Sequence, residues 1–215
     1  MEDTHASVPT AGLVVIGNEI LTGKTTDTNS TYLCRELTRL GVQMERLVTI
    51  PDRFDLIGAM VREFSREFTW VFTSGGIGPT HDDITIPAIA AAFQVPVVRD
   101  PVLEEGIRRH YRERLTEDHL LMARVPEGTE LISVEGLSYP QMKFRNIYIL
   151  PGVPELFRHK FEAIKERFRA RPVILHQFFL KADEGVIAAT LREAAERHAT
   201  VWIGSYPTCS GRSIR

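Results

Sequence analysis

The chain has 215 residues, of which 43% are hydrophobic and 25% charged, and its formal net charge is −2. This composition is typical of a soluble globular protein, and the near-neutral charge argues against nucleic acid or a membrane surface as a partner. No apolar run approaches the roughly 18 residues of a membrane span. The two cysteines, Cys34 and Cys209, match neither a disulfide framework nor a metal-ligand spacing, so we expect free thiols and a cytoplasmic protein. Residues 1–10 lack the basic and apolar regions of a secretory signal and are predicted to be a flexible arm.

From residue 11 onward, short apolar runs alternate with longer segments whose apolar residues recur at helical spacing. In chain order, we predict a strand at 13–16, a helix at 33–40, a strand at 42–50, a helix at 57–68, a strand at 70–73, helices at 84–93 and 103–115, a strand at 147–150 and a helix at 157–168. Repeated strand–helix alternation indicates βαβ units with right-handed crossovers. The sequence therefore predicts an α/β domain with a largely parallel sheet over residues 11–171.

A break is expected at Arg171-Pro172, and a smaller unit follows it. Residues 173–180 are predicted to form a strand, 184–198 a helix and 200–203 a second strand. We therefore expect residues 172–215 to be a small α+β appendage with βαβ order. It is expected to be truncated, because so short a segment makes a thin core by itself.

In open parallel sheets ligands bind beyond the carboxyl ends of the strands, so the residues after each predicted strand are the candidates for function. After the first strand comes Gly-Asn-Glu-Ile-Leu-Thr-Gly at 17–23, and then Asp27 and Thr28 lead into a helix. Aspartate and threonine are good helix caps, which is the structural interpretation of those two residues. Helix capping does not explain Glu19. The residues predicted to contact a ligand here are Gly17, Asn18, Glu19 and Asn29.

The third strand runs into Thr-Ser-Gly-Gly-Ile-Gly-Pro-Thr-His-Asp-Asp-Ile-Thr at 73–85. Three glycines before a helix allow backbone N–H groups to cradle a phosphate, although the pattern is neither a Walker loop nor G-x-G-x-x-G. Asp82 and Asp83 would repel that phosphate unless a cation lay between them, which indicates Mg²⁺ or a similar hard ion. The alternative is that both aspartates only complement the helix dipole. The predicted phosphate-binding residues are Thr73, Ser74, Gly75, Gly76, Gly78 and Thr80.

Two further strand ends carry candidate residues. The segment Pro151, Gly152 and Glu155 after the last predicted strand of the domain is either a tight turn that starts a helix or another wall of the same pocket. Asp52, after the strand that ends at Ile50, is either an ordinary turn residue or a further acid of the site. No Gly-x-Ser-x-Gly motif or activated cysteine is present. The residues indicate a pocket for a phosphorylated ligand and a divalent cation, suited to phosphoryl or nucleotidyl chemistry or to hydrolysis.

Four motifs in this order, Gly-Asn-Glu-Ile-Leu-x-Gly, Asp-Thr-Asn, Gly-Gly-Ile-Gly-Pro-Thr-x-Asp-Asp-Ile-Thr and Leu-Pro-Gly-Val-Pro-Glu, resemble the MoaB/Mog-like domain of the competence/damage-inducible protein CinA family. The resemblance covers about residues 11–170. Segments 145–150 and 204–207 look closest to the molybdopterin-binding-like half of eukaryotic-type FAD synthases. This resemblance implies a three-layer α/β/α fold with a mostly parallel sheet, and assembly as a homo-oligomer.

The resemblance also implies two chemistries. In the molybdenum-cofactor relatives the pocket binds molybdopterin and supports Mg²⁺-dependent adenylylation, and their functional aspartates map onto Asp52 and Asp83. In the CinA-like branch the domain is associated with metal-dependent hydrolysis of ADP-ribose and FAD, for which Glu19, Asn29, Asp82 and Asp83 would surround metal and phosphate. CinA-type sequences carry Asn-Pro-x-Gly-Thr-Ala-Pro-Gly where residues 133–140 here read Ser-Val-Glu-Gly-Leu-Ser-Tyr-Pro, so one wall of the pocket differs.

Our leading hypothesis is a metal-dependent nucleotide pyrophosphatase that acts on an ADP-ribose- or FAD-like substrate. Asp82, Asp83 and Asp52 would be its catalytic residues, and Glu19 would join the two adjacent aspartates in holding Mg²⁺, Mn²⁺ or Co²⁺. One alternative is molybdopterin binding with adenylyl transfer, and another is a binding module without catalysis. In each case the expected ligand is a small nucleotide or pterin.

Overall fold

The computed structural model describes residues 8–134, 139–171, 174 and 176–207. The chain divides into two compact units, residues 1–173 and 174–215, and each is described here by itself. Residues 1–7 of the predicted arm lie outside the described residues, and the arm ends earlier than predicted because Thr10 already belongs to the first strand.

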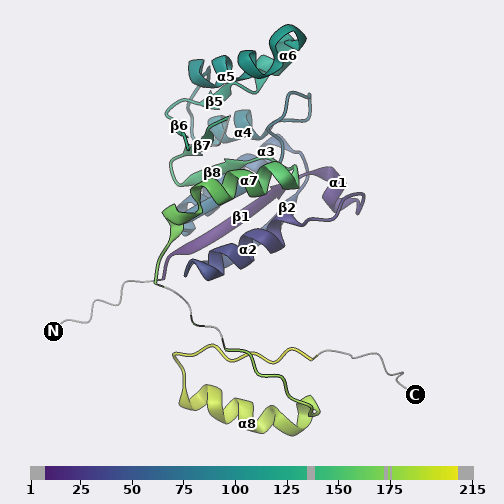
Figure 1. Ribbon diagram of the computed structural model, residues 1–215, viewed down its shortest axis with the longest axis vertical. Helices are drawn as coiled ribbons and strands as arrows, with labels where there is room; N and C mark the ends of the chain where they lie inside the picture. The colour runs from purple at the N-terminus through teal and green to yellow at the C-terminus, as the bar shows by residue number, and fades with distance from the viewer. Residues whose placement is uncertain (1–7, 135–138, 172–173, 175, 208–215) are drawn as a thin grey trace, which may run out of the picture. The chain divides into compact units, whose positions relative to one another are not determined.

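The first unit is built on a six-stranded sheet with the order β2-β1-β3-β8-β7-β6 (Figure 1). Its strands are β1 (Thr10–Ile16), β2 (Gln43–Ile50), β3 (Trp70–Ser74), β6 (Glu130–Ile132), β7 (Gln141–Phe144) and β8 (Ile147–Leu150). β1 pairs in parallel with β2 and β3, and β3 pairs in parallel with β8. β7 runs antiparallel to both β8 and β6. The mostly parallel sheet that the sequence predicts is therefore confirmed, with an antiparallel edge that was not predicted.

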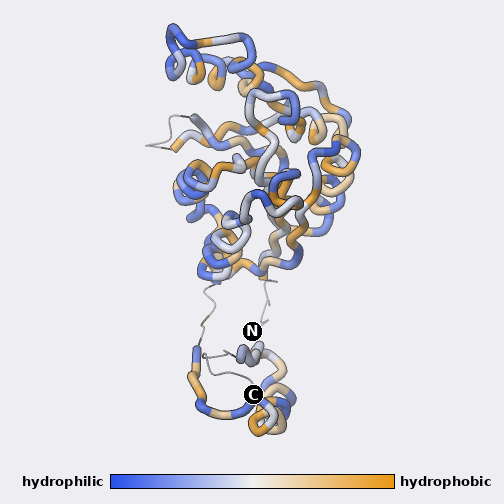
Figure 2. The backbone as a smooth tube through the Cα atoms, turned by 90° about the vertical axis from the view of Figure 1, so that its right-hand side faces the viewer, coloured by the Kyte–Doolittle hydropathy of each residue, from blue (hydrophilic) through white to orange (hydrophobic). Residues whose placement is uncertain are grey.

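Helices cover both faces of this sheet, which confirms the three-layer arrangement. α2 (Asn29–Arg39) and α7 (Pro154–Ile164) pack on one face, and α3 (Phe54–Glu67) and α4 (Thr85–Ala92) on the other. Successive residues of β1 divide between the two layers: Leu13 and Val15 belong to the core under α2 and α7, and Val14 and Ile16 to the core under α3 and α4. Burial on both faces explains why the strand is a continuous apolar run. Figure 2 shows hydrophobic and hydrophilic stretches alternating along the backbone.

A smaller lobe of the first unit lies beyond α4. It contains the antiparallel pair of β4 (Val97–Arg99) and β5 (Arg124–Pro126), with α5 (Pro101–Tyr111), the 3₁₀ turn η1 (Arg112–Arg114) and α6 (Glu117–Leu121). The helix predicted to reach residue 115 ends at Tyr111, because Arg112 adopts a left-handed φ of 50° that stops α-helical hydrogen bonding.

The second unit contains the predicted helix as α8 (Glu184–Arg197), capped by the Asp183 side chain. The two predicted strands are wrong: the described residues of 173–180 and all of 200–203 are not in strand conformation. The apolar side chains that suggested strands stay in solvent, with Phe178 83%, Phe179 94% and Trp202 91% exposed. Without a paired strand or a core to cover, local apolar character does not produce a sheet.

None of the helices in the described part of the chain is long and apolar enough to cross a membrane.

Candidate functional site

Three backbone segments meet at the carboxyl ends of β1, β3 and β8. Gly75 has a φ of +108°, and a Cβ at this position would lie 2.2 Å from the carbonyl oxygen of Ile16. A Cβ on Gly152 would lie 3.3 Å from the Cα of Gly75. The glycines therefore allow the main chains of three loops to touch, which side chains would prevent. The sequence placed both glycines at strand ends, and the structure brings them together.

The loop after β3 is tied to α4 and leaves several N–H groups without partners. The Thr85 hydroxyl donates to the Gly75 carbonyl at 2.9 Å, and the Thr85 N–H donates to the Gly76 carbonyl at 3.0 Å. The Gly75 N–H is occupied, because it donates to Leu150. Among the described residues, the N–H groups of Gly76, Ile77 and Gly78 donate to no protein acceptor. Three successive free N–H groups are the kind of donor set that binds an oxyanion.

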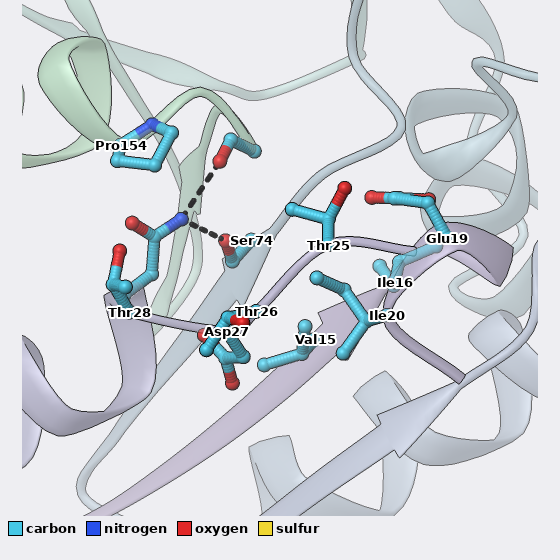
Figure 3. A pocket seen from close by; sticks show the side chains of 12 residues that line it. Val15, Ile16, Glu19, Ile20, Thr25, Thr26, Asp27, Thr28, Ser74 and Pro154 are labelled. Carbon is cyan, nitrogen blue, oxygen red and sulfur yellow. Dashed lines mark hydrogen bonds between the residues drawn. The ribbon is translucent and has the colours of Figure 1, made fainter. Parts of the chain in front are cut away.

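Asn29, the first residue of α2, links this helix to two of these loops. Its side chain is 95% buried, and Nδ2 donates to Ser74 Oγ at 3.0 Å and to the Gly152 carbonyl at 2.8 Å, drawn as dashed lines in Figure 3. Its Oδ1 atom is buried and has no hydrogen-bond partner. Buried acceptors are nearly always paired, so this oxygen is available to a donor on a bound molecule or water.

A hollow opens between these elements (Figure 3). It is lined by Val15, Ile16, Glu19, Ile20, Thr25, Thr26, Asp27, Thr28, Asn29, Ser74, Gly152 and Pro154. Its volume is about 50 Å³, well below the range of roughly 300–1,000 Å³ typical of small-molecule pockets. A nucleotide cannot enter it whole, so a ligand would place one group in the hollow and lie mainly outside.

The residues before α2 have two roles. Asp27 accepts hydrogen bonds from the N–H of Ser30 at 3.0 Å and from the Ser30 hydroxyl, which confirms the predicted cap. Thr28 occupies the N-cap position but makes no side-chain cap bond. Both also line the hollow, together with Thr25 and Thr26, which the sequence did not single out. Nothing in their local pattern distinguishes a pocket wall from an ordinary loop.

Two of the predicted acids lie around the end of β1. Asp52 Oδ2 accepts a hydrogen bond from the Asn18 N–H at 2.9 Å, so this aspartate joins the loop after β2 to the loop after β1. The Glu19 carboxylate folds back over Gly17, where a Cβ would lie 2.5 Å from its Oε1. Glu19 lines the hollow and Asp52 does not.

The adjacent aspartates converge on one hydroxyl. Thr80 Oγ1 lies 2.6 Å from Asp82 Oδ1 and 2.6 Å from Asp83 Oδ2, and the Thr80 N–H donates to Asp83 Oδ2 at 2.8 Å. The Thr80 hydroxyl is the main cause that holds the pKa of Asp82 below its usual range. Asp83 also touches the glycine loop, since a Cβ on Gly78 would lie 2.6 Å from its Oδ2. The His81 side chain, by contrast, is 98% exposed.

The aspartate pair has the chemistry of a hard-cation site. One hydroxyl has a single proton and cannot satisfy two carboxylates, so a divalent ion would relieve the repulsion between Asp82 and Asp83. Mg²⁺ commonly uses one or two carboxylates together with substrate phosphates. In the part of the chain that the structure describes, no three or more His, Cys, Asp or Glu side chains form a metal-binding group. Glu19 therefore does not join the two aspartates in this structure.

The remaining predicted residues lie at the edge of the site or behind it. Thr73 is fully buried with its hydroxyl unpaired, and it does not line the hollow. The Pro151 carbonyl lies 3.5 Å from Ser74 Oγ, and Glu155 is in the first turn of α7, which Pro154 begins. Of the divergent stretch 133–140, residues 135–138 lie outside the described residues.

Comparison with known families supports the fold. Residues 12–176 match the model of a probable molybdopterin binding domain. The chain belongs to this family. Residues 172–215 match a second model, the middle domain of FAD synthase. A solved structure, the CinA protein of Thermoplasma acidophilum with unknown function, is 30% identical, with a TM-score of 0.68, and the match covers 75% of this chain and 98% of that one.

Relatives of this molybdopterin-binding-type chain include a probable FAD synthase of Caenorhabditis briggsae, 30% identical over 96% of this chain and 45% of that protein. A CinA-like protein of Salinibacter ruber is 38% identical over 71% of this chain and 39% of its own length. An Archaeoglobus fulgidus protein is 34% identical over 91% of this chain and 84% of that protein. The resemblance to CinA proteins and FAD synthases is therefore confirmed, and this chain spans less than half the length of those two relatives.

Proposed function

We propose that this molybdopterin-binding-type domain hydrolyses the pyrophosphate bond of an ADP-ribose- or FAD-like nucleotide with the help of a divalent cation. One observation carries the proposal: a single loop holds both the three free N–H groups of residues 76–78 and the paired carboxylates of Asp82 and Asp83. Phosphate oxygens and a cation would therefore be bound side by side, which is the requirement for phosphoryl chemistry.

The residues of the chain take distinct parts in this proposal. The N–H groups of residues 76–78 would bind one phosphate and stabilise the charge that develops on it. The Oδ1 atom of Asn29 would accept a hydrogen bond from the part of the ligand that enters the hollow. Asp52 keeps the loop after β1 in place through Asn18, so its role is positioning. Asp82 and Asp83 would hold Mg²⁺, Mn²⁺ or Co²⁺, which polarises phosphate oxygens and helps to ionise a water.

The test is release of AMP from ADP-ribose and FAD in the presence of Mg²⁺, Mn²⁺ or Co²⁺. The variant Asp83→Asn keeps the size of the side chain and removes its charge, and we expect it to lose at least about 100-fold in rate. Asp118→Asn is the matched control, because Asp118 is an exposed aspartate on α6 in the smaller lobe. No release from folded protein with any of the three metals would overturn the proposal.

Two alternative functions predict different experimental results. The match to a probable molybdopterin binding domain favours molybdopterin binding with adenylyl transfer, which predicts tight pterin binding and ATP-dependent AMP transfer. The second alternative is a binding module without catalysis, which predicts saturable ligand binding and no turnover. We also propose that the chain forms a homo-oligomer, which sedimentation analysis would detect directly.

A further inference from the structure

A second cleft lies at the opposite end of the parallel strands, near the amino ends of β3 and β8. It is formed by the last turns of α3, the end of α4 and the turn between β7 and β8. Its volume is about 390 Å³, within the range of roughly 300–1,000 Å³ for small-molecule sites and far larger than the hollow beside the glycine loop. None of the residues assigned to the proposed hydrolysis lines it.

Three arginines line this cleft without an acidic partner. Within the described residues, Arg62, Arg66 and Arg145 form no ion pair. The two glutamates on α3 that could neutralise them pair instead with Arg46 of β2, at 2.5 Å and 2.8 Å. Arg66 could be explained as a cation that complements the end of α3. This explanation does not apply to Arg145, because Arg145 lies in the turn between two strands. The cleft therefore carries an excess of positive charge.

The backbone of the cleft is strained in two places. Gln94 has a φ of 58° and Arg145 a φ of 54°, and they are two of the three non-glycine residues with positive φ in the described chain. Glycine or asparagine is usual at such positions, because other side chains are less stable in this conformation. Strained residues persist mainly where the side chain has a use, and here both side chains line one cleft.

One of these side chains is also held in place. The guanidinium carbon of Arg145 lies 4.5 Å from the centroid of the Phe93 ring, within the range of a cation–π contact. Stacking on this ring restricts the guanidinium while its charge stays unneutralised. A cation fixed before binding loses less entropy when a ligand arrives.

We propose that this cleft is a second anion site, which takes a small molecule carrying two or more phosphates. Guanidinium groups bind phosphate oxygens through paired hydrogen bonds, and three of them match several negative charges better than a single carboxylate. The amide of Gln94 would add a donor that is independent of charge. The site is separate from the glycine loop and does not depend on hydrolysis there.

The experiment is titration calorimetry with inorganic pyrophosphate at low ionic strength in the presence of EDTA, which removes the metal that the glycine loop would need. We expect saturable binding that weakens as salt is added. Arg66→Gln and Arg145→Gln should each weaken it at least about tenfold, the effect of one charge-assisted hydrogen bond. Arg114→Gln is the matched control, because Arg114 is exposed, forms no ion pair among the described residues and lies in the smaller lobe.

Circular dichroism and melting would show that all three variants are folded. No saturable binding by the unmodified protein would overturn the proposal, as would an equal loss in Arg114→Gln and the cleft variants. Asp83→Asn should bind pyrophosphate normally. Tighter binding in that variant, from loss of a carboxylate that repels phosphate, would place the anion at the glycine loop and overturn the second site. Failure of pyrophosphatase activity would leave this result unaffected.

Discussion

Replacement of Gly75 by alanine tests whether the three loops of the site are held together by main-chain contact. Alanine would have to adopt a φ of +108°, and its Cβ would lie 2.2 Å from the Ile16 carbonyl oxygen, a distance that forces one backbone to move. The conformation costs roughly 1–3 kcal/mol, and overpacking in a close-packed region costs about 1–3 kcal/mol more. We expect Gly75→Ala to lower the free energy of unfolding by about 3–4 kcal/mol.

Gly128→Ala is the control that separates these two effects. Gly128 has a φ of +87°, but an added Cβ there would meet nothing within 4 Å. Only the conformational cost remains, so we expect Gly128→Ala to lower the free energy of unfolding by about 1–2 kcal/mol. The difference between the two variants, about 2 kcal/mol, then measures the contact between Gly75 and Ile16.

Urea unfolding of the first unit would measure both values. The chain has two tryptophans, and Trp202 belongs to the second unit. In a Trp202→Phe background, the fluorescence of Trp70 reports on the first unit. The Trp70 ring packs edge-on against the Phe168 ring, with 5.3 Å between the ring centroids. The two midpoints should differ with equal slopes. If Gly75→Ala and Gly128→Ala lost the same free energy, the inferred main-chain contact at the site would be wrong.

Two further substitutions test other contacts. Thr85→Val removes the buried hydroxyl that donates to the Gly75 carbonyl, and it should lower the free energy of unfolding by about 1–3 kcal/mol. Thr85→Ser keeps the hydroxyl and should retain most of that free energy. An equal loss in both variants would refute the role of the hydroxyl. Burial lowers the pKa of Lys160 to about 8, below its ordinary 10.5, so the unfolded chain binds more protons above pH 8 and stability should rise with pH there. Between pH 7.5 and 9.5 the free energy of unfolding of the unmodified protein should rise by up to about 2 kcal/mol more than that of Lys160→Met. If urea unfolding gave parallel pH profiles for the two proteins, this prediction would be contradicted.

Local sequence was sufficient for the main elements of the first unit. β1 and β8 are continuous apolar runs because both of their faces are covered by helices, and such runs can be recognised without knowledge of the partners. The glycine-rich loop after β3 could also be recognised, because three glycines before a helix have a local conformational meaning. The short strands β6 and β7 could not, since strands of three or four residues leave too little periodicity to detect.

Local pattern was misleading in the second unit. The apolar residues at 173–180 and 200–203 have the composition of strands, yet the described residues of the second unit contain no strand with which they could pair. A strand is stabilised by pairing and by burial of one face, and neither can be read from the segment itself. The helix α8 formed as predicted, because its hydrogen bonds are internal to the segment.

The assembly of the site was decided by tertiary structure. The sequence predicted that acids and glycines follow several strands, because residue type and order are local properties. Which of them meet depends on contacts between distant residues: Asn29 bonds Ser74 and Gly152, 45 and 123 positions away, while Glu19 stays apart from the aspartate pair. The arginine cleft likewise joins α3, α4 and a strand turn. Such contacts depend on strand order and helix packing, which a linear pattern of residue types does not specify.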